Sequence, residues 1–329
     1  MNSSPNLIYP WLQLYWDQLS RYLQQDRLPS ALMLVGGEGL GLSHLAKSFA
    51  NRSLCISPNE AAQACGVCES CVLFNAGNYP DFFHLEPEEG KTSIKIDAIR
   101  QLSASLALSA QYTKTRVVII DPADAMLHQA SNSLLKTLEE PSENTCLILI
   151  AHKPSKIPVT IRSRCQLVTV KNIDLLQAQS WLRELGCPSS EQYLNLASGL
   201  PLLAYDLWKK EALDIRAALF KDFLALIAGR LDPLLFAEKC ISLKGMPVLK
   251  WMMSWLTDAI KYTHSSSGLE LINTDLVAGL KVLVGKLHLK SIHNLLDGLV
   301  RLSALESSQV NQQLMLEEFA IQCYSLTVK

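Results

Sequence analysis

A glycine-rich segment, GGEGLGLS at residues 36–43, has the spacing of a phosphate-binding loop. In the working pattern, G-x-x-x-x-G-K-[ST], the lysine meets the β- and γ-phosphates and the hydroxyl binds magnesium. Gly36, Gly41 and Ser43 match the pattern, whereas Leu42 stands at the position of the lysine. Leucine offers phosphate no donor, so only backbone N–H groups and the start of the following helix could attract an anion. The segment predicts a degenerate nucleotide site, and a plain glycine-rich turn is the alternative.

An acidic residue at the end of an apolar run favours the nucleotide-site interpretation. Residues 116–120 lead into Asp121, at the place where an ATPase of this type holds magnesium. A glutamate that orients the attacking water normally follows, but Pro122 follows here. The sequence therefore predicts no productive ATP binding. A buried strand whose final aspartate caps the next turn is the alternative.

Four cysteines crowd into residues 55–71 with the spacing C-x9-C-x2-C-x2-C. Four thiolates suit tetrahedral zinc, and the short spacings let Cys55, Cys65, Cys68 and Cys71 converge on one ion. Four protein ligands leave no open coordination position, so the expected zinc is structural. Reduced buried thiols are the alternative. Four other cysteines are scattered and are expected to be small core residues, namely Cys146, Cys187, Cys240 and Cys323.

An arginine-containing segment, IPVTIRSRC at residues 157–165, precedes the last apolar run of the first half. Arg164, in the triplet Ser163-Arg164-Cys165, is expected on a loop from which a guanidinium could reach a neighbouring subunit. There it could stabilise charge on a γ-phosphate that the neighbour holds. Arg162 is a lesser candidate for the same role. A surface arginine in a salt bridge is the alternative, and spacing alone favours it.

The first half of the sequence alternates between two periodicities, which predicts the scaffold for these residues. Short apolar runs bounded by turn signals are typical of strands, namely 31–35, 82–85, 116–121, 146–151 and 166–170. Helical patterns lie between them, namely 42–55, 97–109 and 130–140, and Pro141 ends the last one. The alternation predicts a doubly wound α/β domain with a parallel sheet flanked by helices.

Beyond about residue 170 the strand signal fades and the pattern becomes helical. Residues 174–184, 190–197 and 201–210 predict three short helices. Apolar residues then recur at spacings of three and four to the end of the chain. Three such stripes are expected to form the core of a helical bundle, namely Leu219, Phe223 and Leu226; Trp251, Trp255, Leu256 and Ile260; and Leu295, Leu299 and Leu302.

Composition limits the class of protein. The 329 residues are 49% hydrophobic and 19% charged, which is typical of a folded protein with more than one core. The net charge of −1 disfavours a free-standing nucleic-acid binder, which usually carries a basic excess. The sequence shows neither a membrane-spanning run nor a secretory signal, so a cytoplasmic location is expected.

Several of these segments together resemble the AAA+ subunits of bacterial clamp loaders. The resemblance rests on Ser163-Arg164-Cys165, on NSLLKTLEEP at 132–141 and on the four-cysteine insert that follows the loop. Within that family the chain is similar to the delta-prime subunits of DNA polymerase III, which Pro10-Trp11-Leu12 and RLPSA at 27–31 also fit. The resemblance covers residues 1–210 well, and the remainder agrees mainly in length and helicity.

The resemblance implies an architecture and an assembly. An AAA+ domain would span residues 1–170 with the zinc-binding insert at 55–71, followed by a three-helix lid over 171–211 and an all-α collar over 212–329. The collar would join delta and ATP-binding gamma/tau subunits in a hetero-pentamer that loads the sliding clamp onto primer-template DNA. The chain would be a stator that catalyses no reaction itself. It would be an accessory subunit of a DNA-directed DNA polymerase, and the whole polymerase complex would be the nucleotidyltransferase.

The resemblance also implies residue roles. Arg164 would act in trans in the ATP site of the adjacent gamma/tau subunit. Active relatives carry a sensor arginine in a G-S-x-R-D-A pattern, which GLPLLA at 199–204 matches with Leu202 at the arginine position. Lys95 and Arg100 match positions at which active relatives direct basic residues toward DNA. Solvated helix charges are the alternative for these two residues.

Two other function classes remain open. An autonomous AAA+ ATPase with an unusual phosphate loop would bind magnesium-ATP tightly by itself. A zinc-dependent nucleic-acid-binding module would read nucleic acid through the insert at 55–71. The insert contains almost no basic residues and carries Glu60 and Glu69, which disfavours this second class.

Overall fold

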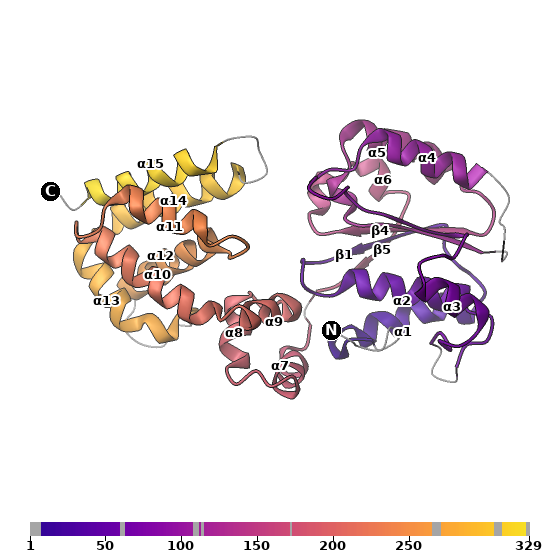
Figure 1. Ribbon diagram of the computed structural model, residues 1–329, viewed down its shortest axis with the longest axis horizontal. Helices are drawn as coiled ribbons and strands as arrows, with labels where there is room; N and C mark the ends of the chain where they lie inside the picture. Colours follow the sequence, from indigo (N-terminus) through magenta and orange to yellow (C-terminus); the bar gives the residue numbers. More distant parts are fainter. Residues whose placement is uncertain are drawn as a thin grey trace. The chain divides into compact units, whose positions relative to one another are not determined.

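The computed structural model describes residues 8–59, 63–107, 112, 115–171, 173–264, 271–305 and 311–326. The chain forms two compact units (Figure 1). The first comprises Met1–Gly186 with Leu200–Leu203, and the second comprises Cys187–Gly199 with Ala204–Lys329. Residues 60–62 of the expected insert and 108–109 of an expected helix lie outside the described residues.

A five-stranded parallel sheet with the order β2-β3-β4-β1-β5 forms the centre of the first unit. The strands are β1 (Ala31–Val35), β2 (Phe82–Leu85), β3 (Arg116–Ile120), β4 (Thr145–Ala151) and β5 (Gln166–Thr169). Strands β3 and β4 are buried along their whole length, as parallel strands with both faces covered must be. The five apolar runs expected from the sequence are these strands, with ends that differ by at most one residue. The α/β fold class is therefore confirmed.

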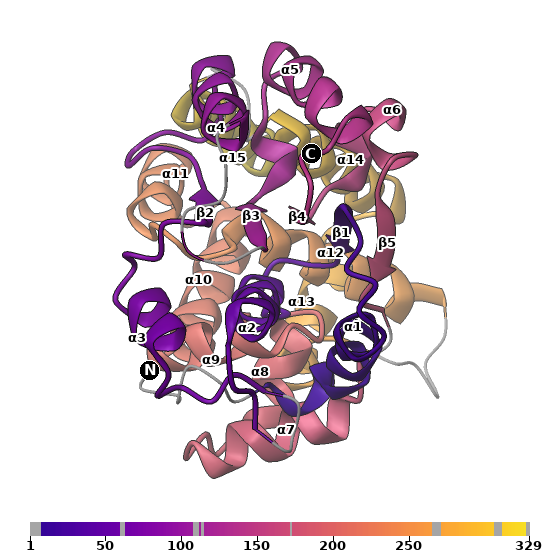
Figure 2. The same ribbon diagram turned by 90° about the vertical axis from the view of Figure 1, so that its right-hand side faces the viewer.

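Helices cover both faces of the sheet (Figures 1 and 2). One face carries α4 (Ile96–Ala107), α5 (His128–Glu139) and α6 (Val159–Arg162), and the other carries α1 (Gln13–Gln24), α2 (Leu42–Leu54) and α3 (Glu69–Asn75). On the first face Leu102 and Leu134 pack with Met33 and Leu149 of the sheet in one apolar cluster. The remaining elements of this unit are the 3-10 helices η1 (Pro10–Leu12), η2 (Ala123–Ala125) and η3 (Pro154–Lys156) and the helix α7 (Leu175–Glu184).

The described part of the second unit is helical. Its elements are α8 (Ser190–Leu196), most of α9 (Pro201–Lys209), α10 (Ala212–Ile227), α11 (Pro233–Ser242), α12 (Val248–His264), η4 (Thr274–Leu276), α13 (Val277–Lys286), α14 (Leu289–Leu305) and α15 (Gln312–Ser325). Trp251, Trp255 and Phe223 are among its largest fully buried side chains, so the apolar stripes on these helices form the core. The expected three-helix segment contains α7, α8 and α9, which the two units divide between them, and its boundaries at 170 and 211 remain predictions.

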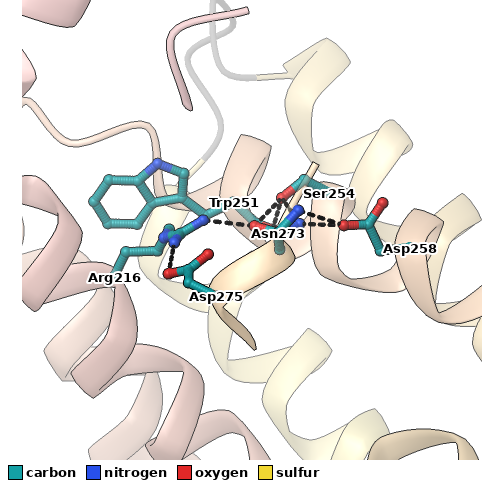
Figure 3. A network of polar contacts seen from close by, with 6 residues as sticks. All are labelled: Arg216, Trp251, Ser254, Asp258, Asn273 and Asp275. Atoms are coloured by element: carbon teal, nitrogen blue, oxygen red, sulfur yellow. Dashed lines mark hydrogen bonds and ion pairs between the residues drawn. The ribbon is translucent and has the colours of Figure 1, made fainter. Parts of the chain in front are cut away.

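A buried polar network ties the segment before α13 to two helices of this unit (Figure 3). Asn273 donates from its backbone N–H and its side-chain amide to the carboxylate of Asp258 on α12, at 2.7 and 2.8 Å. Its side-chain oxygen accepts from Arg216 of α10 at 2.6 Å, and Arg216 also pairs with Asp275. Each buried charge is thereby paired or hydrogen-bonded, as burial requires.

Candidate functional site

The glycine-rich loop joins β1 to α2 in the arrangement of a phosphate-binding loop. Gly41 is the N-cap of α2 and has a φ of 90°, a left-handed conformation that glycine adopts without strain. A Cβ at Gly41 would also lie 2.8 Å from the Tyr9 ring. Both the backbone conformation and the close approach of this ring therefore require glycine at position 41.

Leu42, at the position of the missing lysine, is only 2% exposed. Its side chain turns back toward the loop, because a Cβ on Gly36 would lie 3.3 Å from the Cδ1 atom of Leu42. The lysine of a working loop would instead have to extend to the phosphates. The substitution therefore removes a charge and also fills the inside of the loop with an apolar group.

The segment Leu200–Leu203 covers the outer side of this loop. The N–H group of Leu202 donates to the carbonyl of Gly39 at 3.0 Å. A Cβ on Gly37 would lie 2.8 Å from the Cδ2 atom of Leu200, which shows how closely that leucine approaches the glycine. Two glycines of the loop, Gly37 and Gly39, are thus packed against this chain's own leucines.

Two aromatic residues that precede β1 contact the loop. The indole N–H of Trp11 donates to the carbonyl of Leu40 at 2.9 Å. The ring of Tyr9 stacks on Trp11 with centroids 4.9 Å apart. Trp181 of α7 packs edge-on against both rings. In the sequence Trp11 supports only the family resemblance, and no pattern indicates that its indole contacts the loop.

The two residues expected at a magnesium site lie side by side. The Ser43 hydroxyl, in the first turn of α2, donates to the Asp121 carboxylate at the end of β3, at 2.5 Å. Pro122 follows Asp121 at the position of the missing glutamate. The structure therefore brings together a hydroxyl and a carboxylate that could ligate a cation, with no acid directly after them.

A pocket of about 670 Å³ adjoins the loop, and carboxylates outnumber lysines in its lining. Asp124 in this lining accepts from the backbone N–H of His152 at 2.7 Å, and Lys91 pairs with Glu88 outside the lining. Leu202, at the expected sensor position, also lines the pocket. An excess of carboxylates repels a polyphosphate, because like charges destabilise each other at short range. The charged lining residues are Glu38, Glu86, Asp121 and Asp124 against Lys91 and Lys153.

The four clustered cysteines converge between the end of α2 and the start of α3. Their sulfur atoms all lie within 4.8 Å of one another, and the Sγ atoms of Cys55 and Cys65 are 3.7 Å apart. Zn–S bonds of about 2.3 Å place tetrahedral sulfurs about 3.8 Å apart, so the spacing fits zinc. Backbone N–H groups of Val67 and Cys68 lower the pKa of Cys65 to about 6, whereas burial raises the pKa of Cys71.

The side chain of Arg164 is held by two acceptors of the first unit. Its Nη2 atom lies 2.7 Å from Oε1 of Glu139 at the end of α5, and its Nη1 atom donates to the carbonyl of Thr160 at 2.8 Å. The side chain is still 37% exposed. The sequence indicated an exposed arginine here but gave no role to Glu139, although Glu139 belongs to the stretch NSLLKTLEEP.

The other basic candidates are placed less distinctively. Arg162 is half-buried, and its Nε atom has no hydrogen-bond partner among the described residues. Arg100 lies 3.7 Å from Asp97 one turn earlier in α4, and Lys95 is exposed just before that helix. Neither Lys95 nor Arg100 is committed to a buried contact, so both could meet a ligand in solution. Their role remains a prediction.

Comparison with known proteins identifies the family. The model for "DNA polymerase III, delta subunit" matches residues 12–174, and the model for "DNA polymerase III, delta subunit, C terminal" matches residues 210–324. The chain is 34% identical to DNA polymerase III subunit delta' of Pseudomonas aeruginosa, over 97% of this chain and 98% of the relative. The chain belongs to the DNA polymerase III subunit delta' family. This confirms the family that the motifs indicated.

The chain is also similar to a second delta' subunit and to one solved structure. DNA polymerase III subunit delta' of Yersinia pestis is 33% identical over 81% of this chain and 80% of the relative. A DNA polymerase III gamma subunit-related protein of Thermotoga maritima aligns in structure with a TM-score of 0.46 and 18% identity, over 95% of this chain and 99% of that one. Among the described residues, no helix combines the length and the apolar character needed to cross a bilayer.

Proposed function

We propose that this chain is a non-hydrolysing subunit of a clamp loader, and that it assists the ATP site of a neighbouring subunit. The observation that carries the proposal is the closed loop at residues 36–43. Leu42 fills its interior and the segment Leu200–Leu203 covers its outer side. The acidic pocket beside the loop further disfavours ATP. A subunit of this family that cannot hold nucleotide can still act through its interfaces.

The proposed assistance comes from Arg164. A guanidinium has five N–H donors, and the contacts to Glu139 and Thr160 use one on each terminal nitrogen. Three donors remain for phosphate oxygens of a neighbouring site. Val159 and Leu167, close to Arg164 in the chain, are 66% and 55% exposed apolar residues. Exposed apolar residues close in sequence to an arginine are consistent with a subunit interface, where arginine is enriched.

In the proposed assembly the partners are delta and gamma/tau subunits in a hetero-pentamer, and the complex places the sliding clamp on primer-template DNA. Zinc bound by the four cysteines has a structural role, since all four coordination positions are filled by protein. Lys95 and Arg100 add a modest contact to the DNA backbone. Family membership and the local geometry described above support these proposed roles.

The test uses a complex reconstituted from this chain and the delta and gamma/tau subunits of the same organism. Arg164→Ala should leave assembly unchanged and slow DNA-stimulated ATP hydrolysis, because a finger arginine contributes about 10³–10⁵ in rate at the site it completes. Arg164→Lys should hydrolyse ATP faster than Arg164→Ala but slower than the unsubstituted complex, because lysine keeps the positive charge and lacks the planar guanidinium. An unchanged hydrolysis rate for Arg164→Ala would remove the proposed role.

A second measurement separates the proposal from an autonomous ATPase. Equilibrium dialysis of the isolated chain with labelled ATP and magnesium should show no tight binding. The gamma/tau subunit, measured in parallel, provides the positive control. Tight magnesium-dependent binding by the isolated chain would contradict the non-hydrolysing assignment.

A further inference from the structure

The contact between Glu139 and Arg164 joins two elements that the sheet holds in place. Arg164 follows the short helix α6, and both of its flanks are anchored. Ile161 is fully buried, and Cys165 packs against the core between the sheet and α5. The backbone N–H of Arg164 donates to the carbonyl of Ile161 at 3.0 Å. The backbone of the arginine is thus fixed, and only its long side chain remains to be ordered.

Two acceptors order that side chain at its tip. The Thr160 carbonyl takes one N–H group of the guanidinium at 2.8 Å, and the Glu139 carboxylate takes another at 2.7 Å. The acceptors come from different helices, so the guanidinium plane is fixed relative to both. Without Glu139, only a single hydrogen bond to a carbonyl one turn back in the chain would remain among the described contacts.

Helix stability gives no reason for a glutamate at position 139. Glu139 is the last residue of α5, where the helix dipole carries partial negative charge and disfavours an anion. A half-exposed ion pair adds little to folding, about 0–1 kcal/mol. The carboxylate is therefore better explained by what it does to Arg164 than by what it adds to the stability of α5.

We infer that Glu139 is a positioning residue for the arginine that this chain contributes to its neighbour's ATP site. The inference rests on the proposed function of Arg164. Glu139 holds the guanidinium in one orientation before the subunits meet, while the three unused N–H groups stay available for phosphate oxygens. Ordering a long side chain in advance removes an entropy cost that binding in the transition state would otherwise carry.

The experiment measures kcat and KM for ATP in the DNA-stimulated reaction of the reconstituted complex. Glu139→Ala should lower kcat, and this decrease should be at least half of the decrease that Arg164→Ala causes. KM for ATP should stay unchanged, because Glu139 contacts Arg164 and not ATP. Glu139→Gln should recover part of the rate, because the amide oxygen still accepts from the arginine. The double variant Glu139→Ala/Arg164→Ala should be no slower than Arg164→Ala alone, since both changes remove the same interaction.

Glu140 provides a matched control. It is the next residue, it is exposed at the same helix end, and its carboxylate makes no hydrogen bond or ion pair among the described residues. Glu140→Ala should leave the rate unchanged. Gel filtration and thermal unfolding establish that each variant folds and assembles. If Glu139→Ala fails to fold or assemble, the rate of Glu139→Gln is compared instead.

The outcomes distinguish the inference from the function on which it rests. If Arg164→Ala slows the complex and Glu139→Ala matches the unsubstituted chain, the positioning role is wrong and the arginine's role stands. A faster rate for Glu139→Ala would mean that the carboxylate restrains the arginine, which also overturns the inference. If Arg164→Ala itself has no effect, both the function and the inference fail.

Discussion

Leu42, Pro122 and Leu202 are predicted from the sequence to stand in place of a lysine, an acid and an arginine of an active nucleotide site. Two of these residues make contacts with the loop itself. Leu42 is buried inside the loop, and the backbone N–H of Leu202 is bonded to the Gly39 carbonyl. Restoring one charged side chain would thus place it among apolar groups, and would not by itself open the loop.

Leu42→Lys is expected to restore no magnesium-dependent ATP binding, although it completes the loop pattern. Leu200 and Leu203 would still contact the loop glycines, and the pocket would still be acidic. The variant should lower the free energy of unfolding of the first unit by about 2 kcal/mol, because a fully buried leucine is lost to a charged side chain. Equilibrium dialysis and chemical denaturation measure the two effects.

Leu14→Lys is the control for this substitution, since Leu14 is 74% exposed on α1. It should change the free energy of unfolding by less than about 0.5 kcal/mol. ATP binding by Leu42→Lys at micromolar concentration would show that the missing lysine alone had silenced the site.

At the scale of elements, the sheet was predictable and the contacts between distant elements were not. Apolar runs buried on both faces of a parallel sheet leave a clear pattern in the sequence. The hydrogen bond between Arg216 and Asn273 joins residues 57 positions apart, and no periodicity indicates it. The same holds for the leucines at 200–203 that cover the loop and for the pairing of Glu139 with Arg164.

The cysteine cluster was predictable because its four members are close in the sequence and share one chemistry. The structure adds the elements that they join. Cys55 is the C-cap of α2, Cys68 is the N-cap of α3 and Cys71 lies in the first turn of α3. An ion held by all four would therefore fix the end of one helix against the start of the next.

Zinc is expected at about one ion per chain in protein purified without chelator. Cys68→Ser should release it, because three thiolates leave a coordination position open. Loss of the ion should speed hydrogen exchange in α3 and at the end of α2, while the sheet stays protected. Elemental analysis and hydrogen exchange followed by mass spectrometry give the two readouts.

Cys187→Ser is the control for the zinc measurement, because Cys187 is buried and lies far from the four-cysteine cluster in the sequence. It should retain the full zinc content. A folded, metal-free protein with unchanged exchange in α3 would contradict the structural zinc site.

At the scale of the whole molecule, the charge balance limits how this chain can meet DNA. The chain carries 30 lysines and arginines against 31 aspartates and glutamates. Binding to a duplex depends on neutralising phosphates, and a chain without a basic excess is not expected to do this alone. In the proposed assembly we therefore expect any contact with DNA to be local and to add to contacts made by partner subunits.

The salt dependence of DNA binding by the reconstituted complex tests this local contact. Each phosphate contact contributes about 0.9 to the slope of log K against log salt concentration. Removing both side chains in Lys95→Ala/Arg100→Ala should therefore make the slope shallower by about 2 and weaken binding equally for unrelated sequences, since phosphate contacts carry no base specificity. Lys239→Ala is the control, because Lys239 lies in the second unit and is paired with Asp222. An unchanged slope in the double variant would mean that Lys95 and Arg100 are solvated helix charges. In that case the chain would contribute to clamp loading only through its partner subunits.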